Sequence, residues 1–342
     1  MILLPGTHNP SNLRTSPTMA SMIQFDEDRL LTIGLSTHPS TPGHTLAVLK
    51  SGGVNLFSLP APDFIQALTK ISTTASRLCQ FTSAQRCALV TEGGSSLSLL
   101  PLHGPKVNEP WHPVTMENAG ALVSNELHER GYAGYISSKD GPFMAAEKLS
   151  AICSRIRAVS GLSSPSPPPY NNSNNRFDGP VADRNDHLFA RIVRSEQYHW
   201  RVWEDNHHVA FLFPFANTPG ITILVPRARF AGDVFSSVKG DAFSALMTAT
   251  HHVGNMLNRA FGNARCGMII EGFQDDYAHV KLVPIHHHDD PSVQVSTNNA
   301  GPFNLEYQGF VTSLPGPRYY NMWALQQAAN GLAAMFEMIE EP

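Results

Sequence analysis

The chain has 342 residues, of which 42% are hydrophobic and only 15% are charged, against roughly 25% charged in a typical soluble protein. This length accommodates two domains of ordinary size. The net charge of −4 lacks the basic excess of nucleic-acid-binding proteins, and no run approaches the roughly 18 apolar residues that would suggest a membrane span. We therefore expect no nucleic-acid or membrane partner. The 4 cysteines lack CxxC spacing, which favours a reducing, cytoplasmic location.

The predicted elements of the first half begin with an extended segment that carries the acidic pair Asp26-Glu27. A Pro-Gly turn follows, then a helix over 62–79 and two strands separated by the Glu92-Gly93 turn. We expect this half to end in a strand that begins with a glycine and an aromatic residue, near residue 134, and in a helix over 145–159. Strands outnumber helices and are joined by short turns, which indicates an α+β unit with a mostly antiparallel sheet.

The second half predicts the same order of elements. Its acidic pair is Glu204-Asp205, and a β-branched strand follows over 220–226. Apolar residues at helical spacing predict a helix over 240–260. Two strands then flank the Glu271-Gly272 turn, and a strand near residue 309 and a helix over 320–340 complete this half.

Four blocks of sequence recur in the same order at nearly constant offset: 41–48 with 218–225, 86–93 with 265–272, 99–103 with 282–286, and 134–142 with 309–317. A segment rich in serine, proline and asparagine separates the copies and has no means of packing a core. The sequence therefore predicts one unit over 1–159, a linker over 160–180 and a second unit over 181–342.

The second copy resembles the histidine-triad (HIT) superfamily over roughly residues 186–286. The matching segments are 188–196, Val202-Trp203-Glu204-Asp205, Thr218-Pro219-Gly220 and the strand Tyr277-Ala278-His279-Val280-Lys281-Leu282-Val283-Pro284. The first copy is recognised mainly through the second. The resemblance implies two HIT-like units whose antiparallel sheets join across a two-fold axis, here as a pseudo-dimer within one chain. It also implies nucleotidyl hydrolysis or transfer through a covalent phospho-histidine.

His279 matches the central, nucleophilic histidine of that family. An imidazole that attacks phosphorus splits one hard displacement into two easier ones. Tyr277, His279 and Lys281 alternate along the predicted strand and would share one face. Lys281 would stabilise charge on the phosphoryl oxygens and favour a neutral His279. Tyr277 would orient the imidazole or donate a hydrogen bond to the substrate.

Three further residues are assigned to substrate or phosphate binding. Arg229 stands where the family often has a histidine and offers a planar anion clamp. Phe213 stands where many members have an aspartate that holds the ribose hydroxyls. Glu271 begins a shortened loop before the motif. Because Tyr277 and Lys281 replace the first and third motif histidines, we expect an altered nucleoside pocket.

The first copy has Ser96 in place of His279 and is predicted to be inactive. It would complete the pseudo-dimer and could lend Ser137, Ser138 or the Gly141-Pro142 turn to the second copy's site. The histidine-rich segment 286–290 is interpreted as a solvated loop, so no metal and no cofactor are expected.

The leading function is therefore a HIT-like phosphoryl or nucleotidyl hydrolase or transferase that acts on a small molecule. One alternative is a repurposed enzyme of specialised biosynthesis that performs acid-base chemistry on an apolar substrate, which Phe213 and the low charge content favour. The other is a non-catalytic binding protein. Further self-association of the chain stays open.

Overall fold

The computed structural model describes residues 21–51, 54–106, 132–162, 175–179, 187–262, 265–287 and 300–337. Within these residues the strands are β1 (Met22–Glu27), β2 (Leu31–Ser36), β3 (Thr45–Leu49), β4 (Arg86–Thr91), β5 (Ser96–Leu102), β6 (Arg201–Glu204), β7 (His208–Leu212), β8 (Thr222–Pro226), β9 (Cys266–Ile270) and β10 (Val280–Pro284). The helices are η2 (Leu56–Ser58), α1 (Ala61–Thr82), α3 (Ala146–Ser160), α4 (Leu188–Val193), α5 (Val234–Ser237), α6 (Gly240–Phe261) and α7 (Met322–Glu337). The protein is thus α+β, as the sequence predicts.

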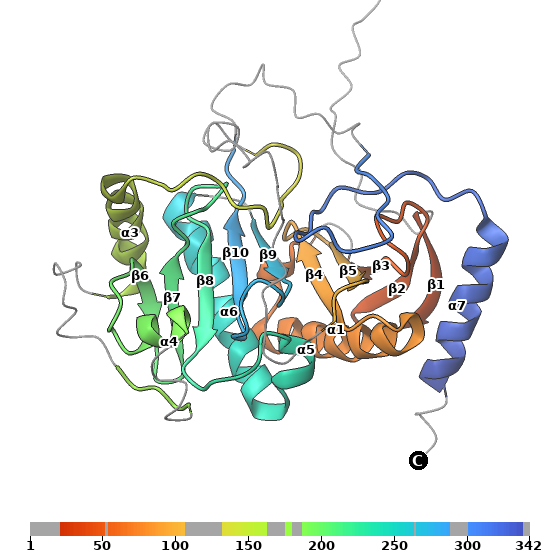
Figure 1. The fold of residues 1–342 in the computed structure, drawn as a ribbon, viewed down its shortest axis with the longest axis horizontal. Coiled ribbons are helices and arrows are strands. Elements are labelled where there is room, and N and C mark those ends of the chain that lie inside the picture. Colours follow the sequence, from red (N-terminus) through yellow and green to blue (C-terminus); the bar gives the residue numbers. More distant parts are fainter. Residues whose placement is uncertain are drawn as a thin grey trace, which may run out of the picture.

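All ten strands form one sheet in the order β1-β2-β3-β5-β4-β9-β10-β8-β7-β6 (Figure 1). The first five come from the first half of the chain and the other five from the second half. Neighbouring strands are antiparallel throughout, including β4 and β9, which pair Leu89 with Ile270 and Val90 with Ile269 across the middle. Counted outward from this central pair, the order is β4-β5-β3-β2-β1 on one side and β9-β10-β8-β7-β6 on the other, so equivalent strands of the two halves occupy equivalent places.

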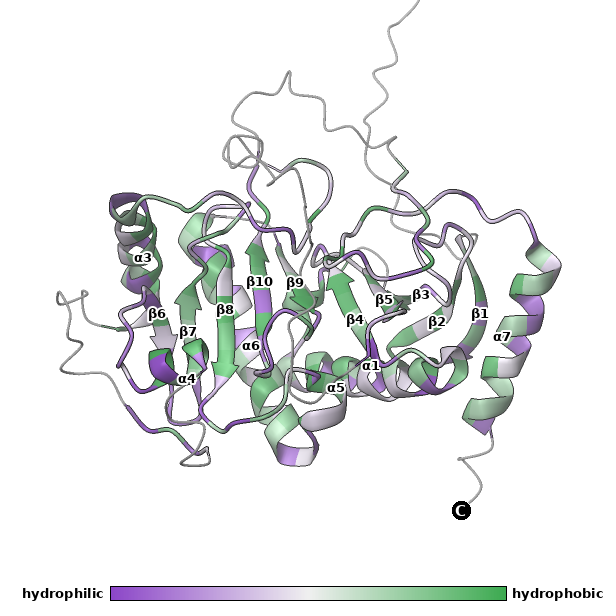
Figure 2. Cartoon of the chain, viewed as in Figure 1, coloured by the Kyte–Doolittle hydropathy of each residue, from purple (hydrophilic) through white to green (hydrophobic). Residues whose placement is uncertain are grey.

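The long helices α1 and α6 pack against each other and against the central strands of the sheet. Each ends where a residue adopts the left-handed conformation, at Ser83 for α1 and at Gly262 for α6. Apolar side chains on one face of each helix are buried, as the predicted helical spacing requires. Figure 2 shows the hydrophobic colouring concentrated on the sheet strands, where both halves share one large core.

The helices α3 and α7 pack on the half of the sheet opposite to their own. Helix α3, from the first half, lies against β6 and α6, where the Trp200 indole donates a hydrogen bond to Ser150 Oγ at 3.0 Å (Figure 1). Helix α7, from the second half, lies against β1, where the Phe25 and Phe336 ring centroids are 5.6 Å apart. Sequence boundaries at 159 and 181 therefore do not delimit self-contained cores.

The last strand predicted for each half is not observed. The segments near residues 134 and 309 are not strands of the sheet, and they pair with each other at an isolated antiparallel bridge between Ser137 and Thr312. Most of the predicted linker lies outside the described residues. None of the helices in the described part of the chain is both long and apolar enough to cross a membrane.

Candidate active site

His279 lies immediately before β10 and is only 3% exposed. Its Nδ1 is 2.7 Å from the backbone carbonyl oxygen of Tyr277. Because a carbonyl only accepts, Nδ1 carries the proton and Nε2 keeps the lone pair. Burial lowers the pKa of His279, Asp275 opposes this shift, and Lys281 lowers the pKa further. The imidazole is therefore neutral at pH 7, which a nucleophile requires.

Helix α4 covers His279 on the sheet face opposite to α6. The ring of Phe189 on this helix meets the imidazole edge to face, with centroids 5.4 Å apart. Phe189 belongs to a small apolar cluster with Phe211 and Tyr277, separate from the large core. This cluster determines how the imidazole is oriented.

Tyr277 is fully buried, and its hydroxyl donates to the Pro226 carbonyl oxygen at 2.7 Å. The side chain thus packs in the apolar cluster around Phe189, and the residue contacts His279 through its backbone carbonyl oxygen. Of the three residues predicted to share one strand, only Lys281 lies within β10, which begins at Val280. Tyr277 and His279 lie in the segment that leads into this strand, and the rings of both contact Phe189.

Arg229 lies over the Tyr277 ring, with its guanidinium carbon 5.0 Å from the ring centroid. One guanidinium nitrogen is 3.4 Å from the Asp276 carboxylate, and another donates to the Phe230 carbonyl oxygen at 2.5 Å. The structure therefore brings the Arg229 guanidinium beside the Tyr277 ring. Part of its charge is already balanced by Asp276.

Lys281 is only 5% exposed and lies within β10. Its ammonium donates to the side-chain oxygen of Gln274 and stands 5.5 Å from the ring centroid of Phe213. A desolvated cation over an aromatic face is held by the ring quadrupole. The structure thus joins two sequence-predicted site residues, Lys281 and Phe213, in direct contact.

Two acidic side chains surround Lys281. Burial raises the pKa of Glu271, while Lys281 and the hydroxyls of Tyr307 and Ser138 oppose the shift. Burial likewise raises the pKa of Asp140, which Lys281 opposes and Asp275 reinforces. Burial therefore makes both carboxyl groups hold their protons more strongly than exposed carboxyl groups do.

The first half of the chain reaches this site through the segment after Ile136. The Ser138 backbone N–H donates to the Val311 carbonyl at 2.9 Å, and Ser138 Oγ accepts from the Val311 N–H at 2.9 Å. Asn217 donates to the carbonyl oxygens of Ser137 and Lys139 at 3.0 and 2.6 Å. Asp140 lies in the same segment, between Ser138 and Gly141. The sequence analysis identified these two neighbours as candidate site residues, but it gave no reason to select Asp140.

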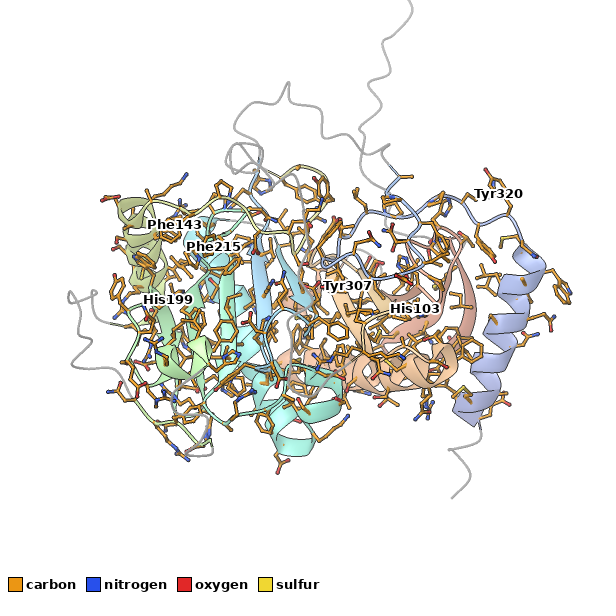
Figure 3. All side chains as sticks on the ribbon, in the orientation of Figure 1. His103, Phe143, His199, Phe215, Tyr307 and Tyr320 are labelled. Carbon is orange, nitrogen blue, oxygen red and sulfur yellow. The ribbon has the colours of Figure 1, made fainter. Side chains whose placement is uncertain are left out.

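A matching arrangement holds Glu92, the counterpart of Glu271. Ser313 Oγ donates to Glu92 Oε1 at 2.6 Å, and the Tyr132 hydroxyl donates to Oε2. The Tyr307 hydroxyl donates to Glu271 in the same way. Figure 3 places Tyr307 near the middle of the molecule, where the two halves meet.

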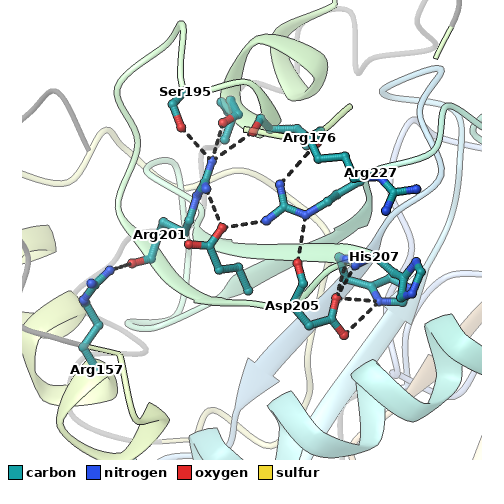
Figure 4. Close-up of polar contacts among 11 residues, drawn as sticks. Arg157, Arg176, Ser195, Arg201, Asp205, His207 and Arg227 are labelled. Atoms are coloured by element: carbon teal, nitrogen blue, oxygen red, sulfur yellow. Dashed lines mark hydrogen bonds and ion pairs between the residues drawn. The ribbon is translucent and has the colours of Figure 1, made fainter. Parts of the chain in front are cut away.

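A buried ionic cluster, which the sequence did not suggest, holds the end of α4. The guanidinium groups of Arg201 and Arg227 are 2.7 and 2.6 Å from the same oxygen of Glu204 (Figure 4). Arg201 also donates to the Ile192 carbonyl oxygen of α4 at 2.7 Å. The cluster therefore fixes the helix that covers His279.

The described part of the chain contains no group of three or more His, Cys, Asp or Glu side chains suited to a metal. Of the histidine-rich segment, 288–290 lies outside the described residues, and His286 Nε2 contacts the Pro219 carbonyl oxygen at 2.7 Å.

In the first half, Ser96 begins β5 at the place that corresponds to the start of β10.

No protein-family model matches the chain. Similar solved structures include a uridylyltransferase with 10% identity and a TM-score of 0.47, covering 99% of this chain and 96% of that one. An ADP-glucose phosphorylase from Arabidopsis thaliana with bound ADP-glucose has 9% identity and a TM-score of 0.43, covering 88% and 82%. A HIT family protein from Bacillus anthracis has 19% identity and a TM-score of 0.31, covering 44% and 97%. At these identities the likeness concerns general fold and assigns no activity to this chain.

Proposed function

We propose that the chain is an intramolecular pseudo-dimer of two HIT-like units, in which the second unit hydrolyses or transfers a phosphoryl or nucleotidyl group. The observation that carries this proposal is the state of His279. Its Nδ1 donates to the Tyr277 carbonyl oxygen at 2.7 Å, so Nε2 of the neutral ring keeps its lone pair. The buried Lys281 is close enough to act electrostatically on this imidazole. An oriented neutral imidazole is the form that attacks phosphorus.

The pseudo-dimer is supported by the sheet and by the exchanged helices. The strand order runs outward identically from the β4–β9 pair. Helices α3 and α7 each pack on the opposite half. Such an exchange is typical of a dimer in which each subunit completes its partner.

In the proposed reaction, His279 Nε2 attacks the phosphorus atom of a small-molecule substrate. The new N–P bond forms as the P–O or P–N bond to the leaving group breaks, and the leaving group takes that electron pair and a proton from solvent. Lys281 stabilises the charge on the phosphoryl oxygens. Attack by water, or by the hydroxyl of a second acceptor, then breaks the N–P bond, returns the electron pair to Nε2 and releases a proton to solvent.

A second candidate is acid-base chemistry on an apolar, uncharged substrate. The acidic residues around Lys281 favour it, since Glu271 and Asp140 interact electrostatically with that lysine and Asp275 acts on both Asp140 and His279. Carboxylates repel a phosphate, whereas carboxyl groups with raised pKa values suit proton donation. Phe213, beside the Lys281 ammonium, would contact an apolar substrate.

Turnover of three substrates distinguishes the candidates: an adenosine phosphoramidate, a dinucleoside polyphosphate and a nucleoside diphosphate. We expect His279→Ala to lower turnover at least about a thousandfold, as loss of a nucleophile does. His207→Ala is the control, because His207 is exposed on the turn before β7. Intact mass should show a phosphorus-bearing adduct on the wild type and none on His279→Ala.

Absence of both turnover and nucleotide binding in the wild type would reject phosphoryl transfer and leave the acid-base candidate. Turnover that survives in His279→Ala would reject the nucleophile. Thermal unfolding of each variant shows whether the fold is retained, so that a lost activity is not mistaken for a lost structure.

A further inference from the structure

A series of ring contacts leads from the proposed catalytic residues to the surface. Phe213 packs against the apolar cluster of Phe189, the residue that covers His279, and its ring centroid is 5.5 Å from the Lys281 ammonium. The ring of Phe215 follows, with its centroid 6.1 Å from that of Phe213. Phe215 is 43% exposed. The row of rings therefore begins beside the buried site and ends in solvent.

Phe143, which comes from the first half of the chain, completes this row. Its ring meets that of Phe215 with centroids 5.4 Å apart and an interplanar angle of 69° (Figure 3). Phe143 is 59% exposed, so a ligand can reach both rings from solvent. We call these two residues the aromatic corner. A flat aromatic ligand can stack on one ring of the corner and meet the other edge to face, which are the two arrangements that aromatic groups prefer.

Backbone hydrogen bonds hold the two sides of the aromatic corner together. The Gly141 N–H donates to the Phe215 carbonyl oxygen at 2.7 Å, and the Met144 N–H donates to the Pro214 carbonyl oxygen at 2.8 Å. The Met144 side chain is buried and anchors this segment in the large core. The corner is thus formed before a ligand arrives, which reduces the entropy lost on binding.

The same backbone arrangement recurs in the equivalent place on the first half. There the Gly316 N–H donates to the His38 carbonyl oxygen at 2.9 Å, and the Tyr319 N–H donates to the Thr37 carbonyl oxygen at 2.8 Å. Donors and acceptors of both bonds stand at the offset of the repeated sequence blocks. The two places are therefore structurally equivalent.

The side chains differ between these two equivalent places. Phe215 corresponds to the half-buried His38, and Phe143 corresponds to the exposed Arg318. Since the same backbone forms with polar side chains, the fold does not require the two phenylalanines. Of the two places, the one that carries them is in the half that has His279. Exposed, adjoining aromatic side chains that the fold does not require indicate a contact with a ligand.

We propose that the aromatic corner holds a flat, uncharged aromatic group of the substrate, joined to the phosphoryl group that His279 attacks. The preferred substrates are then phosphoric esters or amidates that carry an aromatic group of one or two rings, with the phosphoryl oxygens near Lys281 and the rings against the corner. This inference rests on the proposed function. It makes Phe143, from the first half, a residue that selects the substrate of the second.

Two phosphonates test the proposal on the full chain: 2-naphthylmethylphosphonate and methylphosphonate, whose C–P bonds are not expected to break at this site. Equilibrium dialysis should show that the naphthyl compound binds at least about tenfold more tightly, as burial of an aromatic group against two rings predicts. In Phe143→Ala this preference should fall at least about fivefold, whereas Phe143→Tyr should keep it. Tyr320→Ala is the matched control, because Tyr320 is also an exposed aromatic residue, at 89%, and this variant should bind both compounds like the wild type.

Equal affinity of the wild type for the two phosphonates, or an unchanged preference in Phe143→Ala, would overturn the proposal. A third probe, 2-ethylnaphthalene, carries the rings without the phosphonate and should bind more weakly than the naphthyl phosphonate. If these two naphthyl compounds bind equally well, and both lose affinity in Phe143→Ala, the aromatic corner is supported and the phosphoryl group is rejected as part of the ligand. Because phosphonates are not turned over, none of these results depends on whether His279 is the nucleophile.

Discussion

Replacement of Glu204 by glutamine tests the buried ionic cluster that holds α4. Arg201 and Arg227 are 2% and 0% exposed, and both contact one oxygen of Glu204. Arginine keeps its charge at any accessible pH, so Glu204→Gln leaves two buried cations without their shared anion. Loss of one member of a buried pair costs about 3–5 kcal/mol. The Glu204 side chain is 12% exposed and glutamine still accepts a hydrogen bond, so we expect the lower end, about 3 kcal/mol.

Urea unfolding followed by tryptophan fluorescence measures this loss, since Trp200 and Trp203 lie beside the cluster in sequence. The control is Glu196→Gln. Glu196 is paired with Arg194 at 2.6 Å, but its side chain is 51% exposed, so its loss should cost at most about 1 kcal/mol. A free energy of unfolding for Glu204→Gln within about 0.5 kcal/mol of the wild type, the usual range for surface changes, would refute the reasoning.

Three other outcomes follow from the structure. Burial lowers the pKa values of His44 and His199 from 6.5 to about 4. Below pH 6.5 these two imidazoles therefore bind protons in the unfolded chain but not yet in the folded one. Stability should then fall as pH drops from 7 to 5, by about 2 kcal/mol for each histidine at pH 5, measurable by urea unfolding at both pH values. Gly93→Ala should destabilise by at least about 2 kcal/mol, because its Cβ would lie 1.9 Å from the Cys266 carbonyl oxygen. Gly262→Ala, with nothing within 4 Å of its Cβ, should cost only about 1 kcal/mol in thermal unfolding. Residues 181–342 expressed alone should lack native circular dichroism, since their α7 packs on β1 and β9 pairs with β4.

The local elements were predictable because local chemistry determines them. The helix expected over 62–79 is observed as Ala61–Thr82, and that expected over 240–260 as Gly240–Phe261. A proline in the first turn of the first helix and a glycine after the second mark these limits in the sequence. The turns that contain Glu92 and Glu271 likewise separate two strands each, as their sequences indicate.

Contacts between distant segments were not predictable in this way. The segments near residues 134 and 309, which begin with a glycine and an aromatic residue, have strand-like composition. They do not join the sheet and instead pair with each other at Ser137 and Thr312. The exchange of α3 and α7 depends on which half offers an open apolar face, which no local pattern records. Asp140 is a single acidic residue in a loop, and only the fold brings it to Lys281.

The two halves agree at the contacts that hold them together and differ at the position of His279. Glu92 is held by Ser313 from the other half, and Ser138 from the first half acts in turn on Glu271, so each copy stabilises its partner with the same residue types. The position of His279, by contrast, is Ser96 in the first half. In a symmetric dimer of separate chains, one substitution changes both sites at once. In one chain that carries both halves, each position can change independently, so the second half can keep His279, the proposed nucleophile, while the first half has Ser96 and still contributes strands to the shared sheet.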